Sequence, residues 1–124
     1  MRYFMFIVSD PAAEPYDRDQ DDVGRWSDEM TERGISVLGE RLRPAEDATT
    51  IRKRGGQLLV TDGPYIEAKE WVAGFDVIEC RDLDEAIEVA SAHPMARFGT
   101  IELRPCWPLV WDEAGRPLAD EETD

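Results

Sequence analysis

The sequence predicts an α+β fold, and three observations predict it. Two stretches carry apolar residues at helical spacing between polar faces. Short runs rich in β-branched and aromatic residues, bounded by Gly or Pro, flank those stretches. Gly55-Gly56 lies between two further runs, which is typical of a two-residue hairpin turn. The resulting order matches the ferredoxin-like βαββαβ plan with an inserted hairpin, whose sheet has the strand order 4-1-3-2.

The first strand is predicted at residues 2–8. Its odd-numbered positions from 3 to 7 and its even-numbered positions from 4 to 8 are all apolar. Apolar side chains on both faces predict a central strand that is covered on both sides. The helices cover one side, and in so short a chain we expect a second subunit to cover the other. The sequence therefore predicts a homodimer.

The first helix is predicted from Asp17 or Asp19 to Arg33. Acidic residues at its start suit the positive end of the helix dipole, and Gly34 suits the position just after the helix. Its narrow apolar stripe is expected to belong to the core: Val23, Trp26 and Met30.

The second helix has the clearest boundaries. Asp82 is expected to cap its start, with Glu85 three residues later as in a capping box, and Pro94 stops it. Its predicted buried face consists of Leu83, Ala86, Ile87 and Ala90. The remaining predicted strands are Ile35–Arg43, Thr49–Arg54, Gln57–Thr61, Val72–Cys80 and Gly99–Arg104.

The length of 124 residues suits one domain, predicted at 1–111, followed by an acidic disordered tail at 112–124. No apolar run exceeds residues 3–8, so no membrane span is predicted, and the start lacks the features of a signal peptide. We therefore expect a cytoplasmic protein. Cys80 and Cys106 lack the spacing of a zinc site and are expected to be small buried side chains.

The formal net charge of −14 argues against direct binding to nucleic acid or to an anionic membrane. One short segment is basic, through Arg41, Arg43, Arg52, Lys53 and Arg54. We favour polar strand faces as its explanation; the alternative is a contact with an anion or a partner.

The stretch 61–70 combines a turn signal with a cluster of charges. Asp62-Gly63-Pro64 is typical of a tight turn, and a short helical turn is predicted at Ile66–Lys69. A loop that carries acidic and basic side chains is a candidate site. A hairpin corner with a solvated charged face explains the same residues equally well.

The same stretch carries a resemblance to a known family. Thr61-Asp62-Gly63-Pro64-Tyr65, Glu67, Lys69-Glu70 and Gly74-Phe75 resemble the signature of the DGPF branch of the YCII-related family, which usually has Phe in place of Tyr65. The resemblance covers roughly residues 1–106. It implies the ferredoxin-like fold, paired sheet to sheet as a dimeric α/β barrel. Most members of this branch have no assigned reaction.

A better-understood branch of that family includes a dehydrochlorinase with a His–Asp dyad, whose His lies towards the first helix. The corresponding region here is Arg25-Trp26-Ser27-Asp28, without a histidine, so the resemblance does not carry the dyad over.

The predicted topology brings His93 to the same end of the sheet as Gly74, Arg41–Arg43 and the stretch 61–70. His93 has an ordinary pKa near neutrality, and a neighbouring carboxylate would orient it as a general base; the candidates are Asp62, Glu67 and Glu70. The alternative is a histidine that only terminates a helix before a proline. Asp62 and His93 are thus the candidate catalytic pair.

Six further residues are candidates for ligand binding: Tyr65, Glu67, Lys69, Glu70, Glu102 and Arg104. Ion pairs among Lys69, Glu102 and Arg104 and their neighbours are the simpler explanation for the charged ones. One histidine and two scattered cysteines do not form a metal site, and no cofactor motif is present, so we expect no cofactor.

Two functions fit these observations. The first is a protein that binds a small molecule in a dimer pocket. In its more specific form this protein is a cofactor-free acid/base enzyme of lyase or isomerase type. The second is a non-catalytic accessory or regulatory protein, because DGPF-type proteins are often encoded beside extracytoplasmic-function sigma factors. An enclosed pocket lined by Asp62, Glu70 and His93 would favour the first function, and a filled polar cluster of these residues would favour the second.

Overall fold

The computed structural model describes residues 1–64 and 71–118. Its elements are β1 (Arg2–Val8), η1 (Arg18–Gln20), α1 (Val23–Glu32), β2 (Ser36–Arg41), η2 (Ala45–Asp47), β3 (Thr49–Arg54), β4 (Gln57–Asp62), β5 (Val72–Glu79), α2 (Leu83–Ser91), α3 (Met95–Phe98) and β6 (Thr100–Pro105). Strand boundaries lie within two residues of those predicted. The short helix α3 was not predicted. None of the described helices has the length and apolar character needed to cross a membrane.

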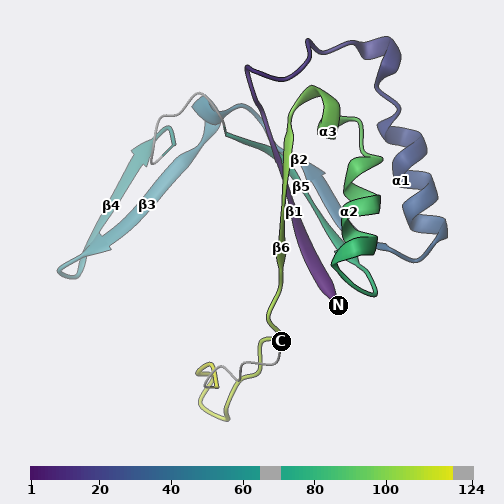
Figure 1. Cartoon of the computed structure of the whole chain (residues 1–124). Coiled ribbons are helices and arrows are strands. Elements are labelled where there is room, and N and C mark those ends of the chain that lie inside the picture. Colours follow the sequence, from purple (N-terminus) through teal and green to yellow (C-terminus); the bar gives the residue numbers. More distant parts are fainter. Residues whose placement is uncertain (65–70, 119–124) are drawn as a thin grey trace.

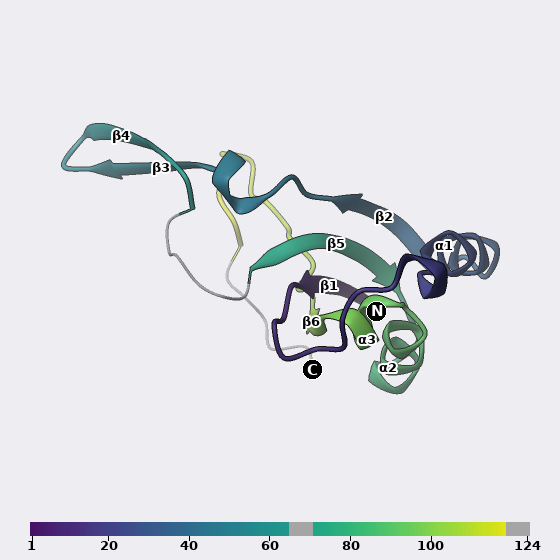
Figure 2. The same ribbon diagram turned by 90° about the horizontal axis from the view of Figure 1, so that it is seen from above.

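Four strands form an antiparallel sheet in the order β2-β5-β1-β6. When only these four strands are numbered along the chain, β1, β2, β5 and β6 become strands 1, 2, 3 and 4. The observed order, read from the β6 edge, is then the predicted 4-1-3-2. Two views show α1 and α2 on the same side of this sheet (Figure 1, Figure 2). The architecture is α+β and compatible with a ferredoxin-like fold.

The core lies between the sheet and the two long helices. Its largest fully buried side chains are Met5, Met30, Ile78 and Val89. The Trp26 indole of α1 donates a buried hydrogen bond of 2.8 Å to the carbonyl of Val89 in α2. Because an unmade bond at this depth would leave two polar groups unsatisfied, the bond fixes α1 against α2.

The first helix begins later than predicted, because acidic side chains bond the backbone before it. The Asp17 carboxylate accepts from the N–H of Asp19 at 3.0 Å, and the Asp21 carboxylate accepts from the N–H of Val23 at 3.2 Å. Such local bonds compete with a regular helix. The result is the separate turn η1, and α1 starts only at Val23.

The second helix is capped as predicted: the Asp82 carboxylate accepts from the N–H of Glu85 at 2.9 Å. Its predicted buried face is wrong at two positions, because Leu83 and Ile87 are about half exposed while Val89 is fully buried. Apolar residues at 83, 86, 87, 89 and 90 allow two inward stripes. In the folded chain α2 turns the stripe that contains Ala86, Val89 and Ala90 inward.

The face of the sheet opposite the helices carries an aromatic cluster. Phe4 and Phe6 alternate with the buried side chains of β1 and are partly exposed. Phe4 stacks on Phe75 of β5, with ring centroids 5.2 Å apart, and its centroid lies 4.6 Å from that of Phe6. The first strand is therefore apolar on both faces, as predicted.

β3 and β4 form a separate two-stranded sheet that extends away from the four-stranded one (Figure 1). Gly55 and Gly56 have φ of 56° and 80°, the left-handed conformation that the predicted two-residue turn requires. Ile51, Leu58 and Val60 are exposed on this hairpin.

Residues 112–118 form a hydrogen-bonded turn, whereas the sequence predicts a disordered tail from 112. The Asp112 carboxylate accepts from the N–H groups of Ala114 and Arg116, both at 2.9 Å. The N–H of Leu118 donates to the carbonyl of Val110 at 2.9 Å. An aspartate that bonds its own turn explains this order in a polar segment.

Candidate functional site

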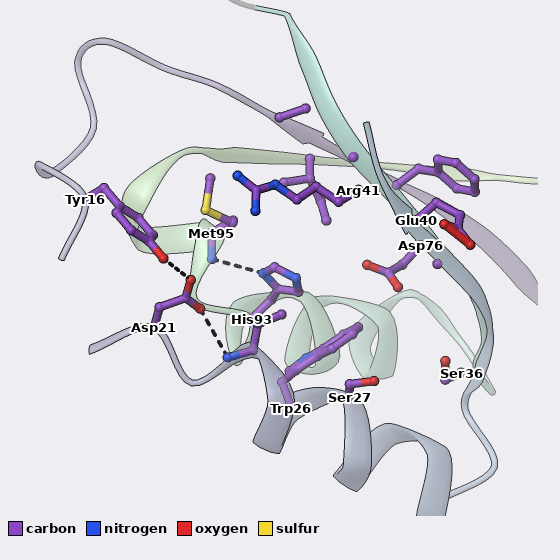
Figure 3. A pocket seen from close by; sticks show the side chains of 16 residues that line it. Tyr16, Asp21, Trp26, Ser27, Ser36, Glu40, Arg41, Asp76, His93 and Met95 are labelled. Atoms are coloured by element: carbon purple, nitrogen blue, oxygen red, sulfur yellow. Dashed lines mark hydrogen bonds between the residues drawn. The ribbon is translucent and has the colours of Figure 1, made fainter. Parts of the chain in front are cut away.

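A cavity of about 500 Å³ lies between the helices and one end of the sheet (Figure 3). His93, which follows α2, lines it together with Arg41 of β2 and Gly74 of β5. The sequence predicts that these three residues meet at one end of the sheet, and the structure confirms it. Side chains from β1, α1 and the segment before α1 complete the wall.

His93 is almost fully buried, with 4% of its surface exposed. Its Nδ1 accepts a hydrogen bond of 3.0 Å from the backbone N–H of Met95, in the first turn of α3. Since Nδ1 is an acceptor, the proton of the neutral ring lies on Nε2. The ring also packs edge-on against Trp26, with centroids 4.7 Å apart.

Burial lowers the pKa of His93 below its ordinary value, and the negative charges of Asp21 and Asp22 oppose that shift. Burial is the larger effect, so the imidazole stays neutral at pH 7. A neutral imidazole whose Nδ1 is occupied has one remaining function, which is to donate from Nε2. No described residue bonds that nitrogen, and Figure 3 shows the ring facing the cavity.

Asp76 also faces the cavity, from the middle of β5 (Figure 3). It pairs with Gly39 on β2 and with Met5 on β1. Among the described residues its carboxylate has no hydrogen bond and no ion pair. Burial without such a partner raises the pKa of Asp76 to about 6, because desolvation disfavours the charged form.

Tyr16 and Asp21 form the rim of the cavity on the side of α1. The Tyr16 hydroxyl donates to the Asp21 carboxylate, and this bond raises the pKa of the Tyr16 phenol. The Tyr16 ring packs edge-on against Phe98 at 5.5 Å. Asp21 is thus already engaged by a phenol and, through Val23, by a backbone N–H.

Arg41 and Asp76 project from the same face of the sheet. Arg41 pairs with Gly74, and Gly39 pairs with Asp76, so these four positions share the face that the helices cover. Glu40 pairs with Phe75 and belongs to the opposite face. Three ionisable side chains from the described sheet strands line the cavity: Glu40, Arg41 and Asp76. By this register, Arg41 and Asp76 are the two that point into it.

The structure does not bring Asp62 and His93 together. Asp62 ends β4 opposite Thr49, in the two-stranded sheet, and is not among the residues that line the cavity. Next to it, the N–H of Gly63 donates to the carbonyl of Ala48 at 2.7 Å, and the Thr50 hydroxyl donates to the carbonyl of Gly63 at 2.8 Å. In this chain Asp62 occupies the end of a hairpin strand.

Two of the predicted ligand-binding residues bond to each other. Arg104 donates to the Glu102 carboxylate at 2.7 Å, and its guanidinium lies 5.0 Å from the centre of the Phe6 ring. Both residues are exposed on the face of the sheet opposite the helices, called the open face below, and away from His93. The other four, Tyr65, Glu67, Lys69 and Glu70, lie outside the described residues, as does the predicted turn at 66–69.

Sequence reasoning missed Asp76. The signal was present: Asp76 has the same parity in β5 as Gly74 and Ile78, so an inward carboxylate sits in a central strand. Burying such a group costs free energy, and carboxylates of this kind are often functional.

No group of three or more potential metal-binding side chains occurs within 1–64 and 71–118.

Comparison with known proteins agrees with the resemblance to the YCII-related family; it does not test the DGPF branch. The family model described as the YCII-related domain matches residues 1–110. An uncharacterized protein of Rhizobium meliloti (strain 1021) is 34% identical, in a match that covers 70% of this chain and 84% of that relative.

Proposed function

The chain belongs to the YCII-related domain family, and we propose that it binds a small molecule in the His93 cavity and moves a proton of that molecule by acid/base chemistry. The observation that carries the proposal is the pair of complementary groups that face one space. Asp76 is a carboxylate with a raised pKa, and His93 is a neutral imidazole that offers an N–H. Groups whose pKa values are shifted in a cavity are typical of active sites.

Asp76 is the general base of the proposed reaction. A base works best when its pKa lies near the working pH, because it is then both deprotonated and able to hold a proton. The raised pKa of Asp76, about 6, meets that condition, whereas an ordinary aspartate does not. Figure 3 shows its carboxylate pointing across the cavity toward the imidazole.

His93 serves as a hydrogen-bond donor, which differs from the general base expected from the sequence. The nitrogen that would take up a proton, Nδ1, already accepts from the N–H of Met95. Nε2–H is left to stabilise negative charge that develops on an oxygen of the ligand. A neutral imidazole acts in this way in other proton-transfer enzymes.

The reaction class that fits these roles is removal of a proton from a carbon next to a carbonyl. Asp76 takes the proton, the C–H electron pair moves into the new double bond, and the carbonyl oxygen becomes an enolate that His93 Nε2–H stabilises. Return of the proton to another carbon gives an isomerisation. If the β carbon carries a leaving group, the enolate re-forms its carbonyl, its electron pair forms a C=C bond to the β carbon, and the β-substituent departs with the electron pair of its own bond to that carbon; Asp76 then passes its proton to the departing group or to solvent. This is an elimination, which is a lyase reaction.

Proton exchange with solvent tests this function without knowledge of the natural substrate. Pyruvate, acetoacetate and levulinate are incubated with the protein in D₂O, and loss of the C–H signals is followed by proton NMR. We expect exchange above the buffer rate on at least one compound, and a loss of about 10²-fold or more in Asp76→Asn.

Asp84→Asn is the matched control, because Asp84 is exposed at the start of α2 and does not line the cavity. It should leave the exchange rate unchanged. Exchange at the buffer rate for every compound, or equal exchange in Asp76→Asn and wild type, would contradict the proposed function.

A further inference from the structure

Arg41 is the cation of the cavity, and within the described residues it has no ion pair or hydrogen bond. Seven other arginines there form ion pairs: Arg2, Arg33, Arg43, Arg81, Arg97, Arg104 and Arg116. The chain has 28 acidic residues against 14 basic ones, so acidic partners are plentiful. An arginine that lines a cavity and lacks such a partner there is available to a ligand.

The nearby acids do not occupy Arg41. Asp21 accepts from the Tyr16 hydroxyl and the N–H of Val23, and the register of β2 places Glu40 on the opposite face. Asp76 shares the face with Arg41 but has no ion pair with it. Figure 3 shows the Arg41 guanidinium reaching over the cavity on the side of His93 and Met95.

The rest of the wall suits a compact apolar body. Trp26, Ile7 and Met95 supply apolar surface, while His93 adds a neutral donor. A planar guanidinium with several N–H groups matches the two oxygens of a carboxylate, which it binds in a bidentate manner. The geometry thus offers one charged and one neutral donor to an acidic ligand, with apolar walls between.

We infer that the ligand of this cavity is a small monocarboxylate, whose carboxylate group pairs with Arg41 while its reactive part lies between His93 and Asp76. The inference rests on the proposed function, because it takes Asp76 and His93 as the reacting groups. It adds the class of ligand and assigns Arg41 as the residue that anchors it.

The test uses sodium benzoate as the probe and benzamide as its uncharged isostere. His93 is the single histidine of the chain, so its imidazole signals in ¹H–¹⁵N NMR report directly on the cavity. We expect benzoate to shift these signals saturably and benzamide to bind at least about tenfold more weakly, since a charge-assisted pair is lost.

Arg41→Gln should weaken benzoate binding about tenfold or more, and Arg41→Lys should weaken it less, because the charge remains but the bidentate geometry is lost. The matched control is Arg43→Gln. Arg43 has 85% of its side chain exposed, pairs with Asp47, and does not line the cavity. This variant changes the net charge equally and should bind benzoate like the wild type.

Three results would overturn the inference: no saturable shift of the His93 signals, equal binding of benzoate and benzamide, or unchanged binding in Arg41→Gln. These are separate from failure of the proposed function. If Arg41→Gln weakens benzoate binding but Asp76→Asn leaves proton exchange unchanged, the carboxylate site stands and the acid/base role of Asp76 is refuted. If Arg41→Gln leaves benzoate binding unchanged but Asp76→Asn lowers the proton-exchange rate, only the carboxylate site is refuted.

Discussion

Gly39 of β2 makes room for the carboxylate of Asp76 on β5. A Cβ atom at position 39 would lie 2.0 Å from Asp76 Oδ1 and 2.9 Å from its Cγ. Real Cβ atoms do not approach other heavy atoms so closely, so any side chain at position 39 would displace the carboxylate. The orientation of Asp76 toward the cavity therefore depends on a residue of the neighbouring strand.

Gly39→Ala should destabilise the fold by about 1–3 kcal/mol, because the carboxylate or the strand must move. In an Asp76→Ala background the same change should cost less, since the clashing atoms are gone. Urea unfolding of the four proteins in the cycle measures both effects. Gly24→Ala is the control: a Cβ there meets nothing within 4 Å, and α1 should gain slightly from alanine. Equal costs of Gly39→Ala in the two backgrounds would contradict the described contact.

Asp76 should make stability fall as pH rises. Its pKa is about 6 in the folded protein, against an ordinary value of 3.8, so between these values the folded state holds a proton that the unfolded state has lost. The free energy of unfolding therefore decreases across this window. Asp76→Asn removes this pH dependence. The unfolding free energy of Asp76→Asn minus that of the wild type should therefore be larger above the window than below it.

We expect that relative gain to be about 1 kcal/mol, less than a fully buried carboxylate would give, because the group is partly exposed and solvent screens it. Urea unfolding of wild type and Asp76→Asn at a series of pH values measures it. A stability difference that stays constant over the whole series would show that Asp76 is not held in a desolvated position.

His93 should titrate below its ordinary value of 6.5, as the Nε2–H tautomer, because burial disfavours the charged ring. Asp21→Asn should lower the pKa of His93 further, since it removes an anion that favours imidazolium. Long-range ¹H–¹⁵N NMR of the single histidine reports both the tautomer and the titration. A proton on Nδ1 would contradict the bond from Met95 and, with it, the donor role.

Asp62→Asn provides the comparison for that titration. The sequence-based hypothesis couples Asp62 with His93 and predicts a downward shift for this variant as well. Because Asp62 lies in the two-stranded sheet and outside the cavity, we expect the His93 curve to stay in place. A clear shift would instead restore the predicted catalytic pair.

We propose that two copies of the chain pair through the open face of the sheet, where Phe4, Phe6 and Phe75 gather. Partly exposed aromatic clusters of this kind usually mark an association surface. Phe6→Asp should convert the dimer into a monomer in sedimentation experiments, while Leu83→Asp, at an exposed apolar position on α2, should not. A wild-type protein that sediments as a monomer at all concentrations would refute the pairing.

The sequence by itself determined the strands, their order and the hairpin, because these depend on local signals. Apolar alternation, the Gly55-Gly56 turn and the Asp82 cap act over a few residues and leave few alternative topologies. The inward stripe of α2 was not decided locally. Leu83 and Val89 are both apolar, and the packing of α2 against the rest of the fold buries Val89 while it leaves Leu83 about half exposed.

The site shows the same division more sharply. The sequence placed His93 at the correct end of the sheet, because topology alone brings the end of α2 to the start of β5. It placed Arg41 there as well, but it did not supply Asp76 and Tyr16, which come from two other segments and meet His93 only in the folded chain. The role of His93 was also a tertiary matter: a single N–H, from Met95, decides which ring nitrogen faces the cavity as a donor.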